Sequence, residues 1–275
     1  MLQGTSRMSP GQHAQTLSIA RDQPLYRQFL RGASLLHGGS APALDHVLEV
    51  NAHPGCTLAQ NPDPALTSRR GPTSASDREP ESDVSPISAH HRDSLPDVLL
   101  VRGSPTIPPG PRLGLVCSVR MKGALILTMY EYGTSLRPDD GVVVCGFHSP
   151  MERQVLELLL ARRVPLIVVP ARNPERMRIP SEWRAPMDEG RLTIVSGVGG
   201  PTRRPTRELA LRRNLLVAAL SDRVLIPCAT PGGAAETVAR AAVDRGIPLW
   251  TFRDEDNAYL LGLGAVALEG RKVGG

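Results

Sequence analysis

Six short aliphatic runs in the C-terminal two thirds of the chain limit its fold more than any other feature. Each run has about six residues, mostly Val, Ile and Leu, without the polar alternation of a half-exposed strand. Such runs are typical of strands that are buried on both faces of a sheet. Their first residues are 24 to 32 positions apart. The runs are residues 113–118, 141–146, 165–170, 191–196, 223–228 and 247–252.

Helical patterns lie between several of these runs. Residues 151–162, 208–220 and 234–245 carry apolar side chains at the spacing of one helix face. Strands that alternate with helices at this spacing predict right-handed β-α-β crossovers and an open parallel sheet. We therefore predict an α/β fold, a Rossmann-like three-layer domain over residues 96–275 with a mostly parallel sheet of about six strands.

The first 95 residues predict a largely irregular N-terminal region. Residues 51–96 are rich in Pro, Ser, Asp, Arg and Gly and show no sustained periodicity. Such a composition cannot bury enough apolar surface to offset the entropy lost on ordering the chain. Two stretches before it, residues 17–36 and 43–50, have the apolar spacing of short helices.

The positive charge of the chain belongs to its C-terminal part. The 275 residues carry a formal net charge of +5, to which residues 1–96 contribute −1 and residues 97–275 contribute +6. Apart from Lys122 and Lys272 every basic residue is an arginine, and the guanidinium group favours bidentate contacts with phosphate. A basic surface on the C-terminal domain is therefore predicted.

Several classes of protein are disfavoured by composition. No apolar run approaches the length of about 18 residues that a membrane span needs, and no secretory signal pattern opens the chain. Cys56, Cys117, Cys145 and Cys228 lack the spacing of a disulfide framework or a zinc site. The histidines and Cys56 in the N-terminal region lack ligand spacing as well. We expect free thiols in a reducing cytoplasm, no metal, no cofactor and no membrane contact.

The candidate site lies in the loops that follow the predicted strands. In open parallel sheets, ligands bind outside the carboxyl ends of the strands and against helix N-termini, where amide groups and the helix dipole attract anions. Ser149, followed by Pro150 and by Glu152 in the first turn, predicts a helix cap there. For His148, a local hydrogen bond or a place in the lining of the pocket is favoured over a role as a general base. The candidate phosphate-binding or nucleic-acid-binding residues are Ser118, Arg120, Lys122, Gly146, His148, Ser149, Arg172, Arg213, Asn214, Pro231, Gly232 and Gly233.

Five short motifs, in order along residues 97–252, resemble a known family. They read C-S-V-R at 117–120, G-F-H-S-P-M-E at 146–152, P-A-R at 170–172, R-I-P-S-E-W-R at 178–184 and R-N-L-L-V-A-A-L-S at 213–221. Together they resemble the DprA/Smf-type DNA-processing proteins, and in particular an uncharacterised DprA-like branch. This family lies within the Rossmann-like superfamily that also contains the Lonely Guy phosphoribohydrolases.

The resemblance implies a function as well as a fold. DprA proteins bind single-stranded DNA and help to load a recombinase during natural transformation, and they tend to form homodimers. Carried over by position, Ser118, Arg120, Arg213 and Asn214 would line the phosphate-binding cleft. The chain departs from the family pattern at Leu215, which replaces a second arginine, and at residues 145–150, which replace a glycine-rich motif.

Two further functions remain as alternatives. The first is a small domain that binds a nucleotide, or a phosphoribohydrolase-like enzyme that acts on nucleoside monophosphates. The Pro231-Gly232-Gly233 turn matches the loop of those enzymes, but Ala239 occupies the place of the catalytic glutamate and Glu236 lies three residues earlier. The second is a degenerate scaffold whose cleft binds nothing and whose N-terminal tail recruits a partner. We favour a non-catalytic, DprA-like protein that binds single-stranded DNA, although aromatic residues, which stack on bases, are only 3% of the chain.

Overall fold

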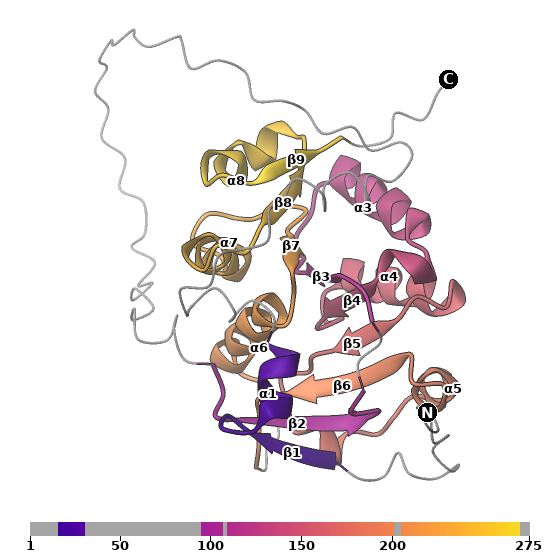
Figure 1. Cartoon of the computed structure of the whole chain (residues 1–275). Coiled ribbons are helices and arrows are strands. Elements are labelled where there is room, and N and C mark those ends of the chain that lie inside the picture. Colours follow the sequence, from indigo (N-terminus) through magenta and orange to yellow (C-terminus); the bar gives the residue numbers. More distant parts are fainter. Residues whose placement is uncertain (1–15, 31–94, 107–108, 201–204, 270–275) are drawn as a thin grey trace, which may run out of the picture.

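The described residues form one sheet between two layers of helices (Figure 1). The computed structural model describes residues 16–30, 95–106, 109–200 and 205–269. The sheet has nine strands in the order β1-β2-β6-β5-β4-β3-β7-β8-β9. The strands are β1 Thr16–Ala20, β2 Val98–Gly103, β3 Arg112–Leu115, β4 Val142–Cys145, β5 Leu166–Val168, β6 Leu192–Ser196, β7 Arg223–Leu225, β8 Leu249–Phe252 and β9 Val266–Leu268.

The predicted α/β fold is confirmed. Each of the six aliphatic runs overlaps one strand, from β3 to β8. In the part of the sheet from β6 to β9, all neighbouring strands are parallel. Three strands were not predicted. Of these, β9 continues the parallel sheet, whereas β2 pairs antiparallel with β6 and β1 pairs antiparallel with β2.

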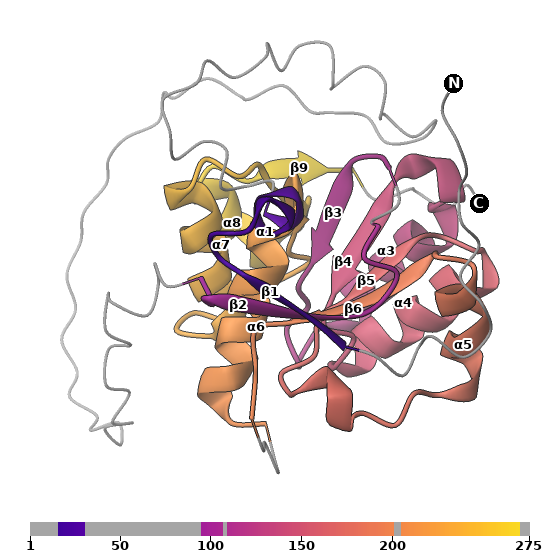
Figure 2. The same cartoon turned by 60° about the horizontal axis from the view of Figure 1, so that its bottom comes forward.

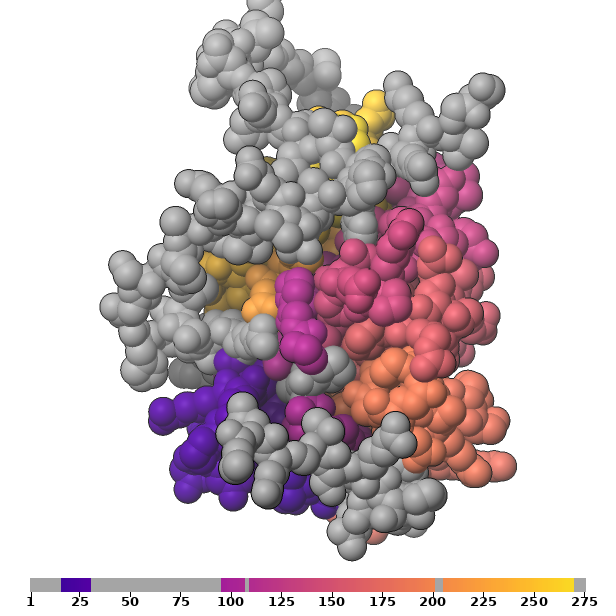
Figure 3. Space-filling model, turned by 45° about the vertical axis from the view of Figure 1, so that its right-hand side comes forward, coloured from indigo at the N-terminus to yellow at the C-terminus, as the bar shows by residue number. Residues whose placement is uncertain are grey.

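Helices cover both faces of the sheet, as a three-layer domain requires. One face packs against α3 (Gly123–Ser135), α4 (Pro150–Ala161) and α5 (Ser181–Asp188). The other packs against α1 (Pro24–Phe29), α6 (Arg207–Ala219), α7 (Ala234–Asp244) and the short α8 (Ala258–Gly262). Figure 3 shows the flank of α3, α4 and α5 as a continuous surface, pink at the upper right and orange at the lower right.

Successive strand residues supply the two halves of the core. In β4, Val142 and Val144 pack on the side of α6 and α7. Val143 and Cys145 point to the opposite face and pack with α3 and α4. This follows from the two-residue period of a strand, and burial on both faces explains why the runs show no polar alternation.

The N-terminal region differs from its prediction. The helix expected over residues 17–36 is wrong at its start, because Thr16–Ala20 forms β1 and a helix covers only Pro24–Phe29. The edge of β2 offers unpaired backbone groups to this segment, and Ile19 pairs with Leu99 there. Residues 16–30 thus pack with the domain that was expected to begin at residue 96, whereas the helix expected at 43–50 lies outside the described residues.

Arg112, at the start of β3, fixes this N-terminal segment. Its guanidinium group donates to the carbonyl oxygen of Phe29 at 2.7 Å and to that of Gln28 at 3.2 Å. These carbonyls belong to the last turn of α1, where the helix dipole favours a cation. The side chains of Tyr26 and Phe29 are buried in the core beside it.

The topology defines one switch point. From β3 the chain proceeds through β4 and β5 to β6 on one side, and α6 then carries it back to β7 on the other side of β3. The loops after β3 and β7 therefore leave the sheet in opposite directions, which is where doubly wound folds bind ligands. Along the described segments, the helices are all too short or too polar to cross a bilayer.

Candidate functional site

The loops after β3 and β7 are joined at the switch point. The hydroxyl group of Ser118 donates to the carbonyl oxygen of Cys228 at 2.9 Å. In return, the thiol of Cys228 donates a long contact of 3.7 Å to the carbonyl oxygen of Arg120. The predicted residues Ser118 and Arg120 therefore lie on a loop that is held against the end of β7.

Three thiols lie at the carboxyl ends of β3, β4 and β7, in that order along the chain. Cys117, Cys145 and Cys228 are free and buried, as expected for these three. Burial raises the pKa of each thiol, so all three are neutral at physiological pH. They pack as small apolar side chains in the core.

Glu152 joins the loops after β3 and β4. This residue is only 3% exposed. Oε1 accepts from the amide of Cys117 at 2.9 Å. Oε2 accepts from the amides of His148 at 2.7 Å and Ser149 at 3.1 Å. The predicted cap is confirmed, because the Ser149 hydroxyl accepts from the amide of Glu152. A carboxylate of the chain itself thus occupies the amino end of α4.

The Pro-Gly-Gly turn after β7 is closed in a similar way. The amide of Gly232, whose φ of 72° suits glycine, donates to Oε2 of Glu236 at 2.6 Å. The amide of Gly233 donates to the carbonyl oxygen of Thr230 at 2.9 Å. Both amides that were predicted to face a phosphate therefore have acceptors within the chain, and the exposed Pro231 has no amide to offer.

Glu236 itself is fully engaged. Its Oε1 accepts from the hydroxyl group of Tyr259 at 2.6 Å and from Nε of Arg240 at 2.9 Å. The hydrogen bond from Tyr259 is the main cause that lowers the pKa of Glu236, and those from Arg240 and the Gly232 amide add to it. Glu236 is therefore an ionised carboxylate that holds the turn and the start of α7.

The loop from β3 to α3 remains open. Within the described chain, the amides of residues 118–122 donate to no acceptor. Lys122 precedes α3 without a side-chain cap, and the first turn of that helix holds no acidic residue. The Lys122 ammonium group pairs with Asp256, whereas the exposed Arg120 pairs with no carboxylate of the described chain. This helix start can therefore accept an anion.

Arg213 brings a second cation to the same edge. It projects from α6 and is 8% exposed. Its guanidinium group covers Gly146 so closely that a Cβ atom at that position would lie 1.7 Å from Nη1. The carbonyl oxygen of Ala210 accepts from its Nε at 3.4 Å, and no carboxylate of the described residues pairs with it. A largely buried, uncompensated cation favours a bound anion. Asn214 follows it and is half-buried.

The remaining predicted residues lie at the same edge but further out. The side chain of His148 is exposed. Arg172 is exposed at the end of β5, two strands from β3. The sequence analysis missed Ser196, whose buried hydroxyl group lies 2.9 Å from the carbonyl oxygen of Arg172 and 3.1 Å from that of Pro170. The sequence feature that could have indicated Ser196 is a hydroxyl residue at the end of an aliphatic run.

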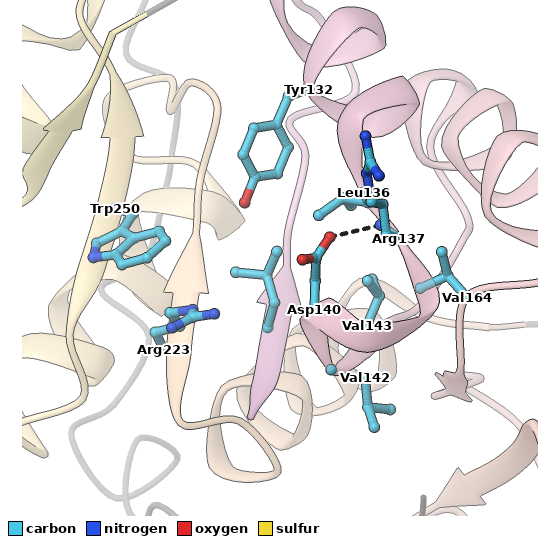
Figure 4. A pocket seen from close by; sticks show the side chains of 11 residues that line it. Tyr132, Leu136, Arg137, Asp140, Val142, Val143, Val164, Arg223 and Trp250 are labelled. Atoms are coloured by element: carbon cyan, nitrogen blue, oxygen red, sulfur yellow. Dashed lines mark hydrogen bonds between the residues drawn. The ribbon is translucent and has the colours of Figure 1, made fainter. Parts of the chain in front are cut away.

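A small hollow lies at the opposite edge of the sheet (Figure 4). Arg223, at the start of β7, places its guanidinium carbon 4.6 Å from the ring centre of Trp250. Asp140 and Tyr132 approach the hollow from the other side. It has room for about one water molecule, which is too little for a nucleotide. Elsewhere in the described ranges, no three His, Cys, Asp or Glu side chains are placed to hold a metal ion.

Comparison with known proteins identifies the fold. The sequence matches no model of a known protein family and no curated protein. Its structure is similar to that of DNA processing protein A from Helicobacter pylori, studied for its single-stranded DNA binding mode, with 21% identity and a TM-score of 0.52 over 67% of this chain and 88% of that chain. It is also similar to DprA from Streptococcus pneumoniae, with 17% identity and a TM-score of 0.53 over 68% of each chain. The domain therefore has a DprA-like fold.

Proposed function

We propose that this chain is a DprA-like DNA-processing protein that binds single-stranded DNA, without catalysis, at the carboxyl ends of β3, β4 and β7. The observation that carries the proposal is the placement of Arg213. Its guanidinium group is largely buried over Gly146, at a strand end beside the switch point, and has no carboxylate partner in the described chain. The fold is shared with a protein from Helicobacter pylori that binds single-stranded DNA, which supports the same conclusion.

The pattern of free and occupied groups favours a polymer of phosphates over a single nucleotide. Mononucleotide sites use loop amides to surround one phosphate group. Here the amides at the start of α4 and in the Pro-Gly-Gly turn donate to Glu152 and Glu236. The groups that remain available to bind phosphate are arginine side chains and the open start of α3. These can bind phosphates that are spaced along a nucleic-acid strand.

The phosphoribohydrolase alternative lacks its reacting group. Glu236 accepts three hydrogen bonds within the chain and has a lowered pKa, so it is neither free to approach a ribose nor a good proton donor. Ala239, at the position of the catalytic glutamate in the enzymes that the loop resembles, is completely buried.

The finer parts of the proposal follow from the family resemblance and the free cysteines. They are a role in recombination during natural transformation, a recombinase partner, a homodimer and a cytoplasmic location. Few aromatic residues are present. We therefore propose that the planar guanidinium groups of arginines stack on some of the bases, as aromatic rings do in other single-strand binding proteins.

A direct competition experiment tests the proposed function. Fluorescence anisotropy would follow the binding of a labelled oligothymidylate of about twenty nucleotides, a length above the usual site size of a single-strand binding domain. We expect binding that an unlabelled oligomer reverses and that an excess of nucleoside monophosphate leaves unchanged. Equal competition by the monophosphate, or release of free base from it, would favour the nucleotide alternative instead.

A further inference from the structure

The chain between β5 and α5 carries a second group of arginines. This segment, residues 169–180, is called the β5–α5 segment below. Arg172, Arg176 and Arg178 are exposed, and none of them pairs with a carboxylate of the described chain. Glu175 is the one acidic residue of the segment. By contrast, some other exposed arginines, such as Arg163 and Arg212, have acidic partners.

The backbone of the β5–α5 segment is held in place at several points. Nη1 of Arg102 donates to the carbonyl oxygens of Pro174 at 2.9 Å and Met177 at 2.8 Å. The side chain of Asn173 caps the short helix η5 (Pro174–Arg176) by accepting from the next-but-one amide. A fixed backbone lowers the entropy cost when the arginines it carries bind a ligand.

The segment begins at the same edge of the sheet as the switch point. The carboxyl ends of β3, β4 and β5 are successive, and neighbouring strands are about 4.8 Å apart. Arg172 lies four residues after the end of β5, so the segment begins at the sheet edge that also carries the loops after β3 and β4. In Figure 2 the β5–α5 segment and the amino end of α6 both lie on the lower side of the molecule.

The opposite side of the switch point is acidic. Asp254, Glu255 and Asp256 follow β8, and their charges raise the pKa of Lys122, chiefly through its hydrogen bond with Asp256. A phosphate backbone is therefore repelled on the β8 side of the site and attracted on the β5 side. This distribution of charge favours the β5 side of the site over the β8 side as the path of a phosphate backbone.

We propose that single-stranded DNA bound at the switch point continues across the end of β4 onto the β5–α5 segment, where Arg172, Arg176 and Arg178 bind its phosphates. This inference rests on the proposed function and adds a second contact region to it. The region extends the length of DNA that one chain contacts. It therefore acts on long oligomers and not on short ones.

The test compares two lengths of oligothymidylate, about six and about twenty nucleotides, with a variant in which Arg172, Arg176 and Arg178 are all changed to Ala. For the long oligomer, we expect the slope of log affinity against log salt to fall by about 2, since each lost phosphate contact on a single strand removes about 0.7. For the short oligomer, the affinity stays within about twofold of the wild type.

A charge-matched variant provides the control. Three other arginines lie near the amino ends of the parallel strands: Arg27, Arg137 and Arg245. Changing all three to Ala removes the same charge and leaves the switch point and the β5–α5 segment unchanged. We expect wild-type slopes from it. The triple Arg172/Arg176/Arg178 variant must fold normally, as judged by circular dichroism. If it then keeps the wild-type slope with the long oligomer, the proposal of a second contact region is wrong. If the Arg120→Ala change still weakens both lengths in that case, the proposed function stands; if the wild type binds neither length, both proposals fail.

Discussion

The amide nitrogen of Cys117 donates a hydrogen bond of 2.9 Å to Oε1 of Glu152, so one buried carboxylate links the loops after β3 and β4. The same carboxylate accepts from two further amides, at His148 and Ser149. The loop that carries Ser118 and the open start of α3 is thereby fixed to the first turn of α4. The geometry of the candidate site depends on this link.

Replacing Glu152 with Gln should destabilise the fold and weaken DNA binding. A glutamine side chain has one acceptor oxygen, and its NH₂ group would face an amide donor that then has no partner. We expect a loss of about 1–3 kcal/mol in the free energy of unfolding, measured with urea. Glu157→Gln, at an exposed position of the same helix, is the control. Equal stability of the two variants would contradict the role given to Glu152.

A methyl group at Gly146 should act through Arg213. The added Cβ would overlap the guanidinium group and displace it from the end of β4, whereas the flexible side chain can move without disturbing the core. We expect Gly146→Ala to weaken oligonucleotide binding about as much as Arg213→Ala, with little change in melting temperature. The double variant should be no weaker than either single variant. Additive losses would show that the two positions act independently.

The acidic limb of the stability curve should report on Glu236. The hydrogen bonds from Tyr259, Arg240 and the Gly232 amide lower its pKa below the ordinary value of 4.5. A lowered pKa stabilises the fold above pH 4.5, and this stabilisation is lost as the pH falls through the folded-state pKa. Glu236→Gln should therefore be less stable than the wild type at neutral pH, and the difference should shrink below pH 4.5. Thermal unfolding at several pH values measures it; a difference that is constant with pH contradicts the assignment.

Arg112 should prove essential for docking the N-terminal segment. Arg112→Met keeps the length of the side chain but removes the donors to Phe29 and Gln28. Hydrogen bonds from charged donors contribute about 1.5–3 kcal/mol each, so we expect a loss in this range at least. Hydrogen exchange should rise in residues 16–30 more than in β4. Unchanged protection of residues 16–30 would show that β1 alone holds the segment.

The parallel strands could be predicted because they are buried on both faces. A strand in that position is mostly aliphatic, and runs such as 141–146 are short enough to favour a strand over a buried helix. The cap at Ser149 was equally local, because it needs only Pro150 and Glu152 beside it. Both features depend only on residues that are adjacent in the sequence, so they could be predicted from it.

The missed elements depend on distant partners. Thr16–Ala20 is a strand because it pairs with the edge of β2, some eighty residues later in the sequence. The local sequence does not reveal this partner, and its apolar spacing by itself predicts a helix. Glu152 and Glu236 each also accept from one group far away in the sequence, the amide of Cys117 and the hydroxyl group of Tyr259. Sequence shows the glycines that could surround a phosphate, but it does not show that the Gly232 amide donates to Glu236 or that the Cys117 amide donates to Glu152.

The salt dependence of DNA binding tests the central claim most directly. Binding of an oligothymidylate of about twenty nucleotides should weaken steeply as salt rises, because phosphate contacts release counterions. Arg120→Ala should lower the slope of log affinity against log salt by about 0.7, and Arg137→Ala, at the opposite edge of the sheet, should leave it unchanged. An affinity that does not change between low and moderate salt, or equal slopes for the two variants, would contradict a phosphate-binding site at the carboxyl ends of β3, β4 and β7.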